Sequence, residues 1–372
     1  MSFRSVPLFA TLIIGFILLS PGYDLKGQEP HGGEHESEAV QHEEESGSEG
    51  FNASEYIMEH IADSHEWHIL TKPNGEHVSV YLPVILYSKH SGLHIFSSKK
   101  IAHGHSHEGF QMGHGKLGDK NLEGVIVEVD EHGEMAGEGI PLDLSITKNV
   151  FMMMLSVIIL LSLFLSLARS YKRTGISEPK GIQGFLEPVI VFIEEDVAIP
   201  NLGEEKYHRY LPYLLTVFFF ILLNNLMGLI PFFPFGANVT GNIAVTGVLA
   251  VITFLITQFS GNRGYWQHIF NTPGVPVWLA PIMIPVEIIG MFTKPFALMI
   301  RLFANITAGH IIVLSLLSMI FIFKSVGMSI PSMVMVLFMD CIEILVAFLQ
   351  AYIFTLLSAL FIGLAMPEHH HD

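Results

Sequence analysis

The sequence reads Ile300-Arg301-Leu302-Phe303-Ala304-Asn305-Ile306-Thr307-Ala308-Gly309-His310 in the middle of a long apolar region. An arginine at bilayer depth costs about 3 kcal/mol on insertion scales, so its side chain must face protein or water. In a helix, Asn305 lies one turn beyond Arg301 on nearly the same face. His310 lies about 13 Å further along the axis than Arg301, on the opposite face. This stretch therefore predicts a membrane helix that carries a functional site.

A second apolar run, from Ile342 to Tyr352, adds two more polar side chains. Glu343 and Gln350 are seven residues apart, so in a helix they share a face and lie about 10 Å apart. The two runs together contain one fixed cation, one histidine, one acid and two amides. Ionisable groups inside a membrane are typical of proton relays, and this set indicates a proton path.

The composition places the whole chain among membrane proteins. Its 372 residues are 50% hydrophobic and 15% charged, and the mean hydropathy is +0.48. The formal charge of −16 arises almost entirely between Gln28 and Asn149, and the remainder is close to neutral. No basic patch is present to meet phosphates, so we expect no nucleic-acid partner. The single Cys341 excludes a disulfide within the chain.

The first fifty residues predict two segments that precede any membrane domain. Residues 1–22 combine Arg4, an apolar core from Val6 to Leu19 and small residues, which is typical of a signal peptide. The core is too short for a membrane span, although an uncleaved anchor is the alternative. Residues 23–50 are acidic and rich in His and Ser, so we expect them to be disordered.

Residues 51–149 predict a small α+β appendage on the outer side of the membrane. We expect a helix at Glu55–Ile69 and strands at His77–Tyr87 and Gly124–Val129, with a His-rich link at Ala102–Gly118 between the strands. The spacing of the histidines favours a solvated acidic segment over a zinc or copper site, and we predict no metal and no cofactor. The histidines concerned include His31, His35, His103, His105, His107 and His114.

The membrane domain is predicted at residues 150–367, with a tail at 368–372. Phe151–Ala168 is a first span, and the cluster Arg169, Lys172 and Arg173 marks its cytoplasmic end. We therefore expect a protein of the bacterial inner membrane, with the appendage on the periplasmic side and the C-terminus in the cytoplasm. Further segments follow, namely an amphipathic surface helix at Gly184–Pro200 and spans at Leu211–Ile230 and Asn242–Phe259.

The last two apolar runs are too long for ordinary spans. As straight helices, Leu279–Phe323 and Met333–Leu364 would measure about 67 and 48 Å, whereas the hydrocarbon core is about 30 Å thick. Each run is either two short spans or one strongly tilted helix, and the lack of a polar turn favours tilt. With a break at Lys324–Pro331, the predicted fold is an all-α polytopic membrane protein of about five membrane helices, two of them long and tilted.

The same residues carry a family resemblance. The run RLFANITAGH, the preceding Lys294-Pro295, the segment Gln350-Ala351-Tyr352 and the motif NLMGLIP at Asn225–Pro231 resemble the membrane-embedded a subunit of F-type ATP synthases. The resemblance covers roughly Phe151–Pro367. It implies a stator proton channel with two half-channels, whose partners are the c-ring proteolipid subunits, b-type peripheral stalk subunits and membrane lipid.

The resemblance also assigns roles to individual positions. Arg301 would face the rotor carboxylate, while His310 and Glu343 would form the inlet path. Asn305 and Gln350 would either line the path or act as hydrogen-bonding glue between helices. Glu287 would line the cytoplasmic outlet, or else extend to the membrane surface. Polar residues of the inlet are also expected in the outer loop, at Asn238, Thr240 and Asn242.

Two alternatives to this function remain. Arg301 could be structural and pair with Glu343, and the chain could be a stand-alone secondary ion transporter, although we see no internal repeats. An intramembrane metalloenzyme would need clustered histidines or HExxH, whereas His310 is alone in its run. No GxxxxGK[ST] motif is present, so we expect no nucleotide site and no enzyme activity in this chain by itself.

Overall fold

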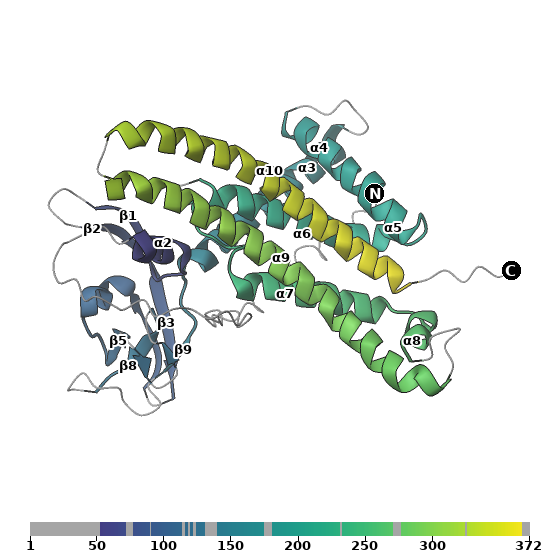
Figure 1. The fold of residues 1–372 in the computed structure, drawn as a ribbon, viewed down its shortest axis with the longest axis horizontal. Helices are drawn as coiled ribbons and strands as arrows, with labels where there is room; N and C mark the ends of the chain where they lie inside the picture. Colours follow the sequence, from purple (N-terminus) through teal and green to yellow (C-terminus); the bar gives the residue numbers. More distant parts are fainter. Residues whose placement is uncertain are drawn as a thin grey trace, which may run out of the picture.

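The structure is a computed structural model in which five long helices carry a small β-rich appendage at one end (Figure 1). It describes residues 53–71, 77–89, 91–113, 116–117, 120–121, 124–130, 140–174, 181–230, 233–270, 277–323 and 326–366. The predicted signal peptide (1–22), the acidic segment (23–50) and the tail (368–372) lie outside the described residues.

The described residues of the appendage form one short helix, nine short strands and two 3-10 turns. Its central sheet has three antiparallel strands in the order β4-β3-β9, and the β5–β8 pair covers one face of it. Val84, Leu86 and Phe96 of the sheet pack there against Phe110 of β5 and Ile126 of β8. The elements are α2 (Ala53–Ile61), β1 (Glu66–Thr71), β2 (His77–Tyr81), β3 (Pro83–Ser88), β4 (Gly92–Ser97), the 3-10 turns η2 (Ser98–Lys100) and η3 (Ala102–Gly104), β5 (Phe110–Met112), β6 (Lys116–Leu117), β7 (Lys120–Asn121), β8 (Ile126–Glu128) and β9 (Leu142–Asp143).

Several boundaries predicted for the appendage were wrong. The helix expected at Glu55–Ile69 ends at Ile61, because Glu66–Thr71 pairs with β2 and that pairing outweighs the local helical pattern. The strand expected at His77–Tyr87 is two strands, divided where Pro83 has no N–H to continue the ladder. The link expected at Ala102–Gly118 contains β5, which pairs with β8.

The junction between the appendage and the first membrane helix, α3 (Lys148–Thr174), is densely bonded. A carboxylate oxygen of Asp63 accepts from the backbone N of Asn149 over 3.1 Å and so caps the N-terminal end of α3. The ammonium group of Lys148 donates to the carbonyl of His60 over 3.1 Å. The Trp67 ring packs edge-on against Phe151, with 6.0 Å between the ring centroids. The appendage is therefore docked on the membrane domain rather than tethered by a loop.

In the part of the chain that the structure describes, five helices are long and apolar enough to cross a membrane, as predicted. They are α3, α6 (Tyr207–Gly228), α7 (Ile243–Ser260), α9 (Ala280–Phe323) and α10 (Val326–Leu364). The α6 helix is buried along most of its length, whereas few residues of α9 and α10 are fully buried. The remaining helices are α4 (Ile182–Phe192), the π-helix η4 (Ile193–Ala198), α5 (Ile199–Leu202), α8 (Arg263–Phe270) and the 3-10 turn η5 (Val277–Leu279).

The segment predicted as an amphipathic surface helix forms the continuous α4–η4–α5 unit. Its η4 portion buries Ile193 and Val197 in the core formed with α6 and α10, and it leaves Glu195 and Asp196 exposed. This segment is not among the candidate spans.

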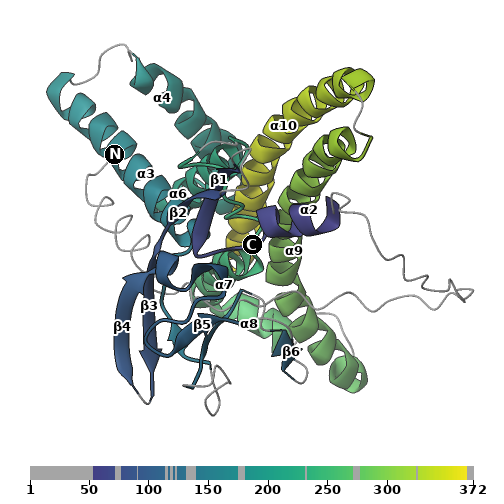
Figure 2. The ribbon, with the colours of Figure 1, turned by 90° about the vertical axis from the view of Figure 1, so that its left-hand side faces the viewer.

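Each of the two long apolar runs forms one helix rather than two short spans. With 44 and 39 residues, α9 and α10 are about 66 and 58 Å long. They lie side by side in both views (Figures 1 and 2). The predicted break at Lys324–Pro331 was too long, because α10 already begins at Val326 and includes Pro331. A proline this close to a helix start removes only one hydrogen bond of the first turns.

Candidate functional site

A small cavity lies where α6, α9 and α10 meet. Its volume is about 20 Å³, which is room for one water molecule. Polar and apolar side chains from all three helices line it: Asn225 and Leu229 of α6, Asn305, Ile306, Gly309 and His310 of α9, and Glu343, Val346 and Ala347 of α10. Three of the predicted polar residues of the two motif runs, Asn305, His310 and Glu343, thus meet at one place.

His310 and Glu343 are the two titratable residues of this cavity. Nε2 of His310 and Oε1 of Glu343 are both buried, and neither has a hydrogen-bond partner among the described residues. Two glycines allow these side chains to come so close to neighbouring backbone. A Cβ atom on Gly309 would lie 2.6 Å from Oε1 of Glu343, and one on Gly228 would lie 3.7 Å from Nε2 of His310. The cavity is therefore lined by an acid and an imidazole, each with a buried polar atom that is free to form a further hydrogen bond.

Asn225 connects the cavity to the loop between α6 and α7. Its Oδ1 accepts from the Thr240 hydroxyl over 2.5 Å, and its Nδ2 donates to the carbonyl of Ala347 over 3.3 Å. The side chains of the other two polar loop residues named from the sequence form hydrogen bonds with the backbone instead. Asn238 accepts from Gly241 N over 3.0 Å, and Asn242 caps α7 by accepting from Ala244 N.

Asn225 and Asp340 had been given no role on sequence grounds. The signal for Asn225 was its place at the start of the NLMGLIP motif, in a helix that is otherwise apolar. Asp340 is a second acid on α10, half-buried and one turn before Glu343, and its acidic side chain in an apolar run was the available signal.

A hydrogen bond joins the two long helices beside the cavity. Nδ2 of Asn305 donates to Oε1 of Gln350 over 2.9 Å. The Gln350 side chain is buried, and its Nε2 has no partner among the described residues. The bond is of the kind that the glue alternative requires, while Asn305 also lines the cavity, so both roles stay predictions.

Arg301 lies one turn before Asn305, and its side chain is exposed on the surface of α9. It is not among the residues that line the cavity. Within the part of the chain that the structure describes, no ion pair involves Arg301, so the structural alternative of a pair with Glu343 is not realised. The exposed guanidinium is accessible from outside the chain.

Glu287 is not brought to the other predicted residues. It is half-buried in α9, fourteen residues before Arg301, which corresponds to about 21 Å along the helix. It lines neither of the two cavities described here.

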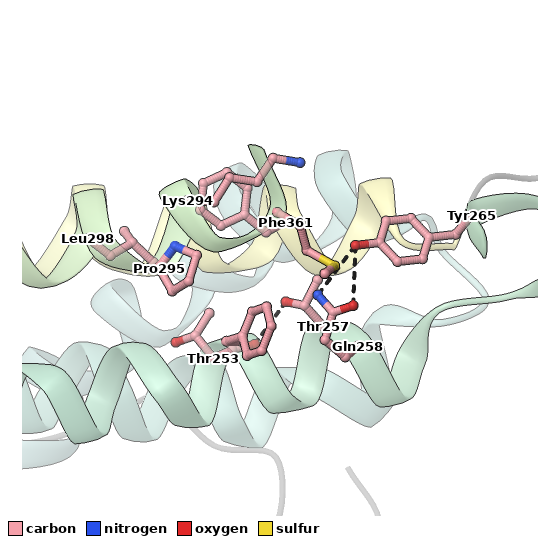
Figure 3. Close-up of a pocket in the computed structure, with 10 residues that line it drawn as sticks. Thr253, Thr257, Gln258, Tyr265, Lys294, Pro295, Leu298 and Phe361 are labelled. Carbon is pink, nitrogen blue, oxygen red and sulfur yellow. Dashed lines mark hydrogen bonds between the residues drawn. The ribbon is translucent and has the colours of Figure 1, made fainter. Parts of the chain in front are cut away.

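A second cavity, also of about 20 Å³, lies between α7, α8, α9 and α10 (Figure 3). Lys294 lies over the Phe361 ring, with Nζ 5.6 Å from the ring centroid. Gln258 and the Tyr265 hydroxyl are hydrogen-bonded at 3.3 Å. The lining residues include one cation and no acid or histidine, so this cavity has no pair suited to proton transfer.

Two described histidines of the appendage, His94 and His107, bond to neighbouring side chains. Nδ1 of His94 lies 2.7 Å from Glu108, and His107 accepts from Lys100 over 3.0 Å. The hydrogen bond from His94, aided by the charges of His107 and Lys100, lowers the pKa of Glu108. No group of three or more metal-ligating side chains occurs among the described residues. The predictions for His31, His35 and His114, and for the His103 side chain, lie outside what the structure describes.

Comparison with known proteins divides the chain into the same two parts. A family model described as ATP synthase A chain matches residues 150–363, and one described only as a domain of unknown function matches residues 56–144. Similar proteins include ATP synthase subunit a of Chloroherpeton thalassium, 49% identical over 62% of this chain and 69% of its own. ATP synthase subunit a 2 of Chlorobaculum tepidum is 52% identical over 65% and 68%, and the Chlorobium phaeobacteroides subunit a is 46% identical over 73% and 83%.

Proposed function

This chain belongs to the ATP synthase A chain family, the proton-conducting stator subunits of F-type ATP synthases, and we propose that His310 and Glu343 form its proton inlet. The chain is an integral membrane protein and a non-catalytic subunit of the ATP synthase complex. The open question is which of its residues move the proton.

The cavity between α6, α9 and α10 is the observation that carries the proposal. It brings His310 and Glu343, from two different helices, to one space that is large enough for a water molecule. Their buried, unpartnered atoms can accept and release a proton through that water. Asn225 and Thr240 extend the polar lining toward the loop between α6 and α7.

Arg301 acts on the rotor rather than in the inlet. Its exposed guanidinium faces outward from α9, where the c-ring proteolipid subunits are the expected partner. An opposite charge nearby favours the ionised form of a passing rotor carboxylate. Because a guanidinium stays protonated in proteins, it also separates the two half-channels without conducting protons itself. The Asn305–Gln350 bond fixes the α9–α10 pair beside Arg301.

We also propose an outlet, a driving force and a tilt of the long helices. Glu287, about four turns before Arg301 on α9, lines the outlet half-channel on the cytoplasmic side. The driving force is about 2.3 kcal/mol per charge for each 100 mV of membrane potential. Both long helices exceed the bilayer thickness and lie strongly tilted against the rotor.

We propose the orientation from charge. Arg169, Lys172 and Arg173 at the end of α3 are cytoplasmic, which puts the appendage on the periplasmic side of the bacterial plasma membrane and the C-terminus inside. The b-type peripheral stalk subunits are the second set of partners.

Proton flux through the reconstituted membrane sector tests the inlet. His310→Ala and Glu343→Ala should each reduce the flux, whereas Ile344→Ala, at the exposed neighbour of Glu343, should leave it near the wild-type level. Normal flux in both inlet variants would contradict the proposal. Vesicles that contain this chain without c subunits should carry no protons, and flux in them would favour the stand-alone transporter.

A further inference from the structure

The three-stranded sheet of the appendage is apolar on both faces. One face packs against β5 and β8, as described above. On the other face lie Ile85 and Tyr87 of β3, Leu93 and Ile95 of β4, and Leu142 and Leu144 at β9; we call this the outer-sheet patch. Sheets with one solvated face normally place polar residues there, so this patch needs an explanation.

The strand register places the six side chains of the outer-sheet patch next to one another. Ile85 pairs with Ile95, and Tyr87 pairs with both Leu93 and Leu142. Leu144 follows at the next position of the same face, where its backbone N donates to the carbonyl of Ile85. Five of the six are exposed, with Leu93 at 60% and Ile95 at 65%. A contiguous patch of this kind marks a protein or membrane contact.

The outer-sheet patch faces toward the membrane helices. In Figure 1, β5 and β8 lie to the left of β3 and β9, away from α6 and α7, so the opposite face is turned to the side of the membrane helices. Figure 2 shows β3 and β4 side by side and lateral to these helices. The chain passes from Leu144 to the start of α3 at Lys148, where exposed apolar residues continue with Met154 and Ile158.

The chemistry of the patch fits lipid better than a protein. Apart from Tyr87, the titratable residues of these three strands are His94 and Asp143, and both lie on the other face, where they bond to Glu108 and His65. The patch therefore carries no charge with which to select a protein partner. Tyr87, with an apolar ring and a polar tip, is a residue type enriched at membrane–water interfaces.

We propose that the outer-sheet patch rests on the outer leaflet of the same membrane and holds the appendage against the lipid beside α3. The patch continues the lipid-exposed surface of the membrane helices onto the extramembrane part of the chain. It gives the appendage a second attachment besides the bonds at the start of α3.

Fluorescence quenching in the reconstituted ATP synthase complex tests this contact. In a Cys341→Ser background, Ile95→Cys would carry an environment-sensitive dye in phospholipid vesicles. Ser106→Cys is the matched control, since Ser106 is exposed but lies before β5, on the other layer. Quenching by spin-labelled lipid should be at least about threefold stronger at position 95 than at 106, and quenching by aqueous iodide should be weaker, because the apolar face enters the interface.

The remaining outcomes overturn the proposal. Equal iodide quenching at both positions would mean that the patch is solvated. Protection from iodide without lipid quenching would mean that a protein covers it, either a second copy of this chain or another subunit. Leu142→Cys repeats the measurement at a second strand, so that a folding defect of one variant does not decide the result. In the Leu142→Cys chain, the added change Leu93→Asp should reduce lipid quenching at least about twofold, because it introduces a charge into the patch.

Discussion

Gly309 on α9 faces the carboxyl group of Glu343 on α10 so closely that a Cβ atom on the glycine would lie 2.6 Å from Oε1. The contact fixes where the acid of the proposed inlet sits relative to His310, the next residue along α9. Since the carboxylate is the movable end of a long side chain, a methyl group at position 309 would displace it without opening the helix pair.

We expect Gly309→Ala to reduce proton flux while the complex still assembles. The change should stabilise the α9 helix by up to about 1 kcal/mol, because alanine is a better helix former than glycine. Instability of the helix would therefore not explain a loss of proton flux. Gly290→Ala is the control, since nothing lies within 4 Å of a Cβ atom at that position of the same helix. Equal flux in the two variants would show that the position of the Glu343 carboxylate does not matter.

The exchange of His310 and Glu343 tests whether the two act as one relay. Glu343→Ala should slow proton entry, and His310→Glu should place two carboxylates in one cavity, where they cannot both ionise easily. The double variant His310→Glu with Glu343→His restores one acid and one imidazole, so it should recover more flux than either single change. A double variant no better than the worse single one would shift the relay to Asn305 and Gln350.

Arg301→Ala should abolish ATP-driven proton pumping in vesicles without loss of assembly. A neighbouring positive charge lowers the pKa of an acid by about one to three units. Loss of Arg301 should therefore reduce the rate of proton pumping at least about tenfold. Arg301→Lys should fail nearly as badly, because a compact ammonium lacks the planar fork of donors. Arg263→Ala, which removes a cation from the exposed surface of α8, should pump normally. Pumping by Arg301→Ala would rule out the assigned role.

The His65–Asp143 contact should make the junction sensitive to acid. Burial opposes ionisation of Asp143, but the hydrogen bond and charge of His65, with the Ser145 bonds, outweigh it and lower the pKa of Asp143. Its stabilising contribution is therefore complete above the unfolded-state pKa, about 4, and is lost as the pH falls through the lower folded-state value. Hydrogen bonds to a charged group typically contribute about 1.5–3 kcal/mol.

Hydrogen exchange of the β3–β9 amides measures this loss. At neutral pH, wild type should be better protected than Asp143→Asn, and the difference should shrink below about pH 4 as the carboxylate is protonated. The β5–β8 amides in the same sample serve as the internal reference. A difference that persists unchanged in acid would mean that the charge of Asp143 is not the cause.

Deletion of Gln28–Gly50, with the preceding residues kept, should leave proton transport intact. This hydrophilic stretch carries none of the motifs of the two long apolar runs. Pumping by inverted vesicles, normalised to the amount of assembled complex, is the measurement. A loss at normal subunit levels would assign this segment a part in transport.

The membrane half could be predicted because apolar length is a strong local signal. The five spans follow from the apolar runs. That α9 and α10 are each one continuous helix follows from the lack of a polar turn within either run. The appendage was harder, since its strands are short and its sheet is apolar on both faces. In β4, for example, Leu93 and Ile95 are exposed while Phe96 is buried, so the usual alternation of polar and apolar residues is missing and the strand was not predicted.

The site was predictable to the extent that polar residues stand out in apolar helices. Arg301, His310 and Glu343 were proposed on this ground, and the structure brings the last two into one cavity. The part played by Asn225 depends on contacts with Thr240 and Ala347, which lie 15 and 122 residues away, and no local pattern encodes such contacts. Glu287 is separated from the others by the length of α9, and its role stays a prediction.

The capped start of α3 has a practical consequence for measurements of rotor movement in the ATP synthase complex. Because Asp63 accepts a hydrogen bond from the backbone of Asn149 and Lys148 donates one to His60, we expect the appendage to keep its orientation relative to the first membrane helix. A marker fixed to its sheet, such as an antibody fragment or a gold particle, would report the orientation of the stator itself. The rotor could then be followed against a reference frame that belongs to the same chain as the proton path.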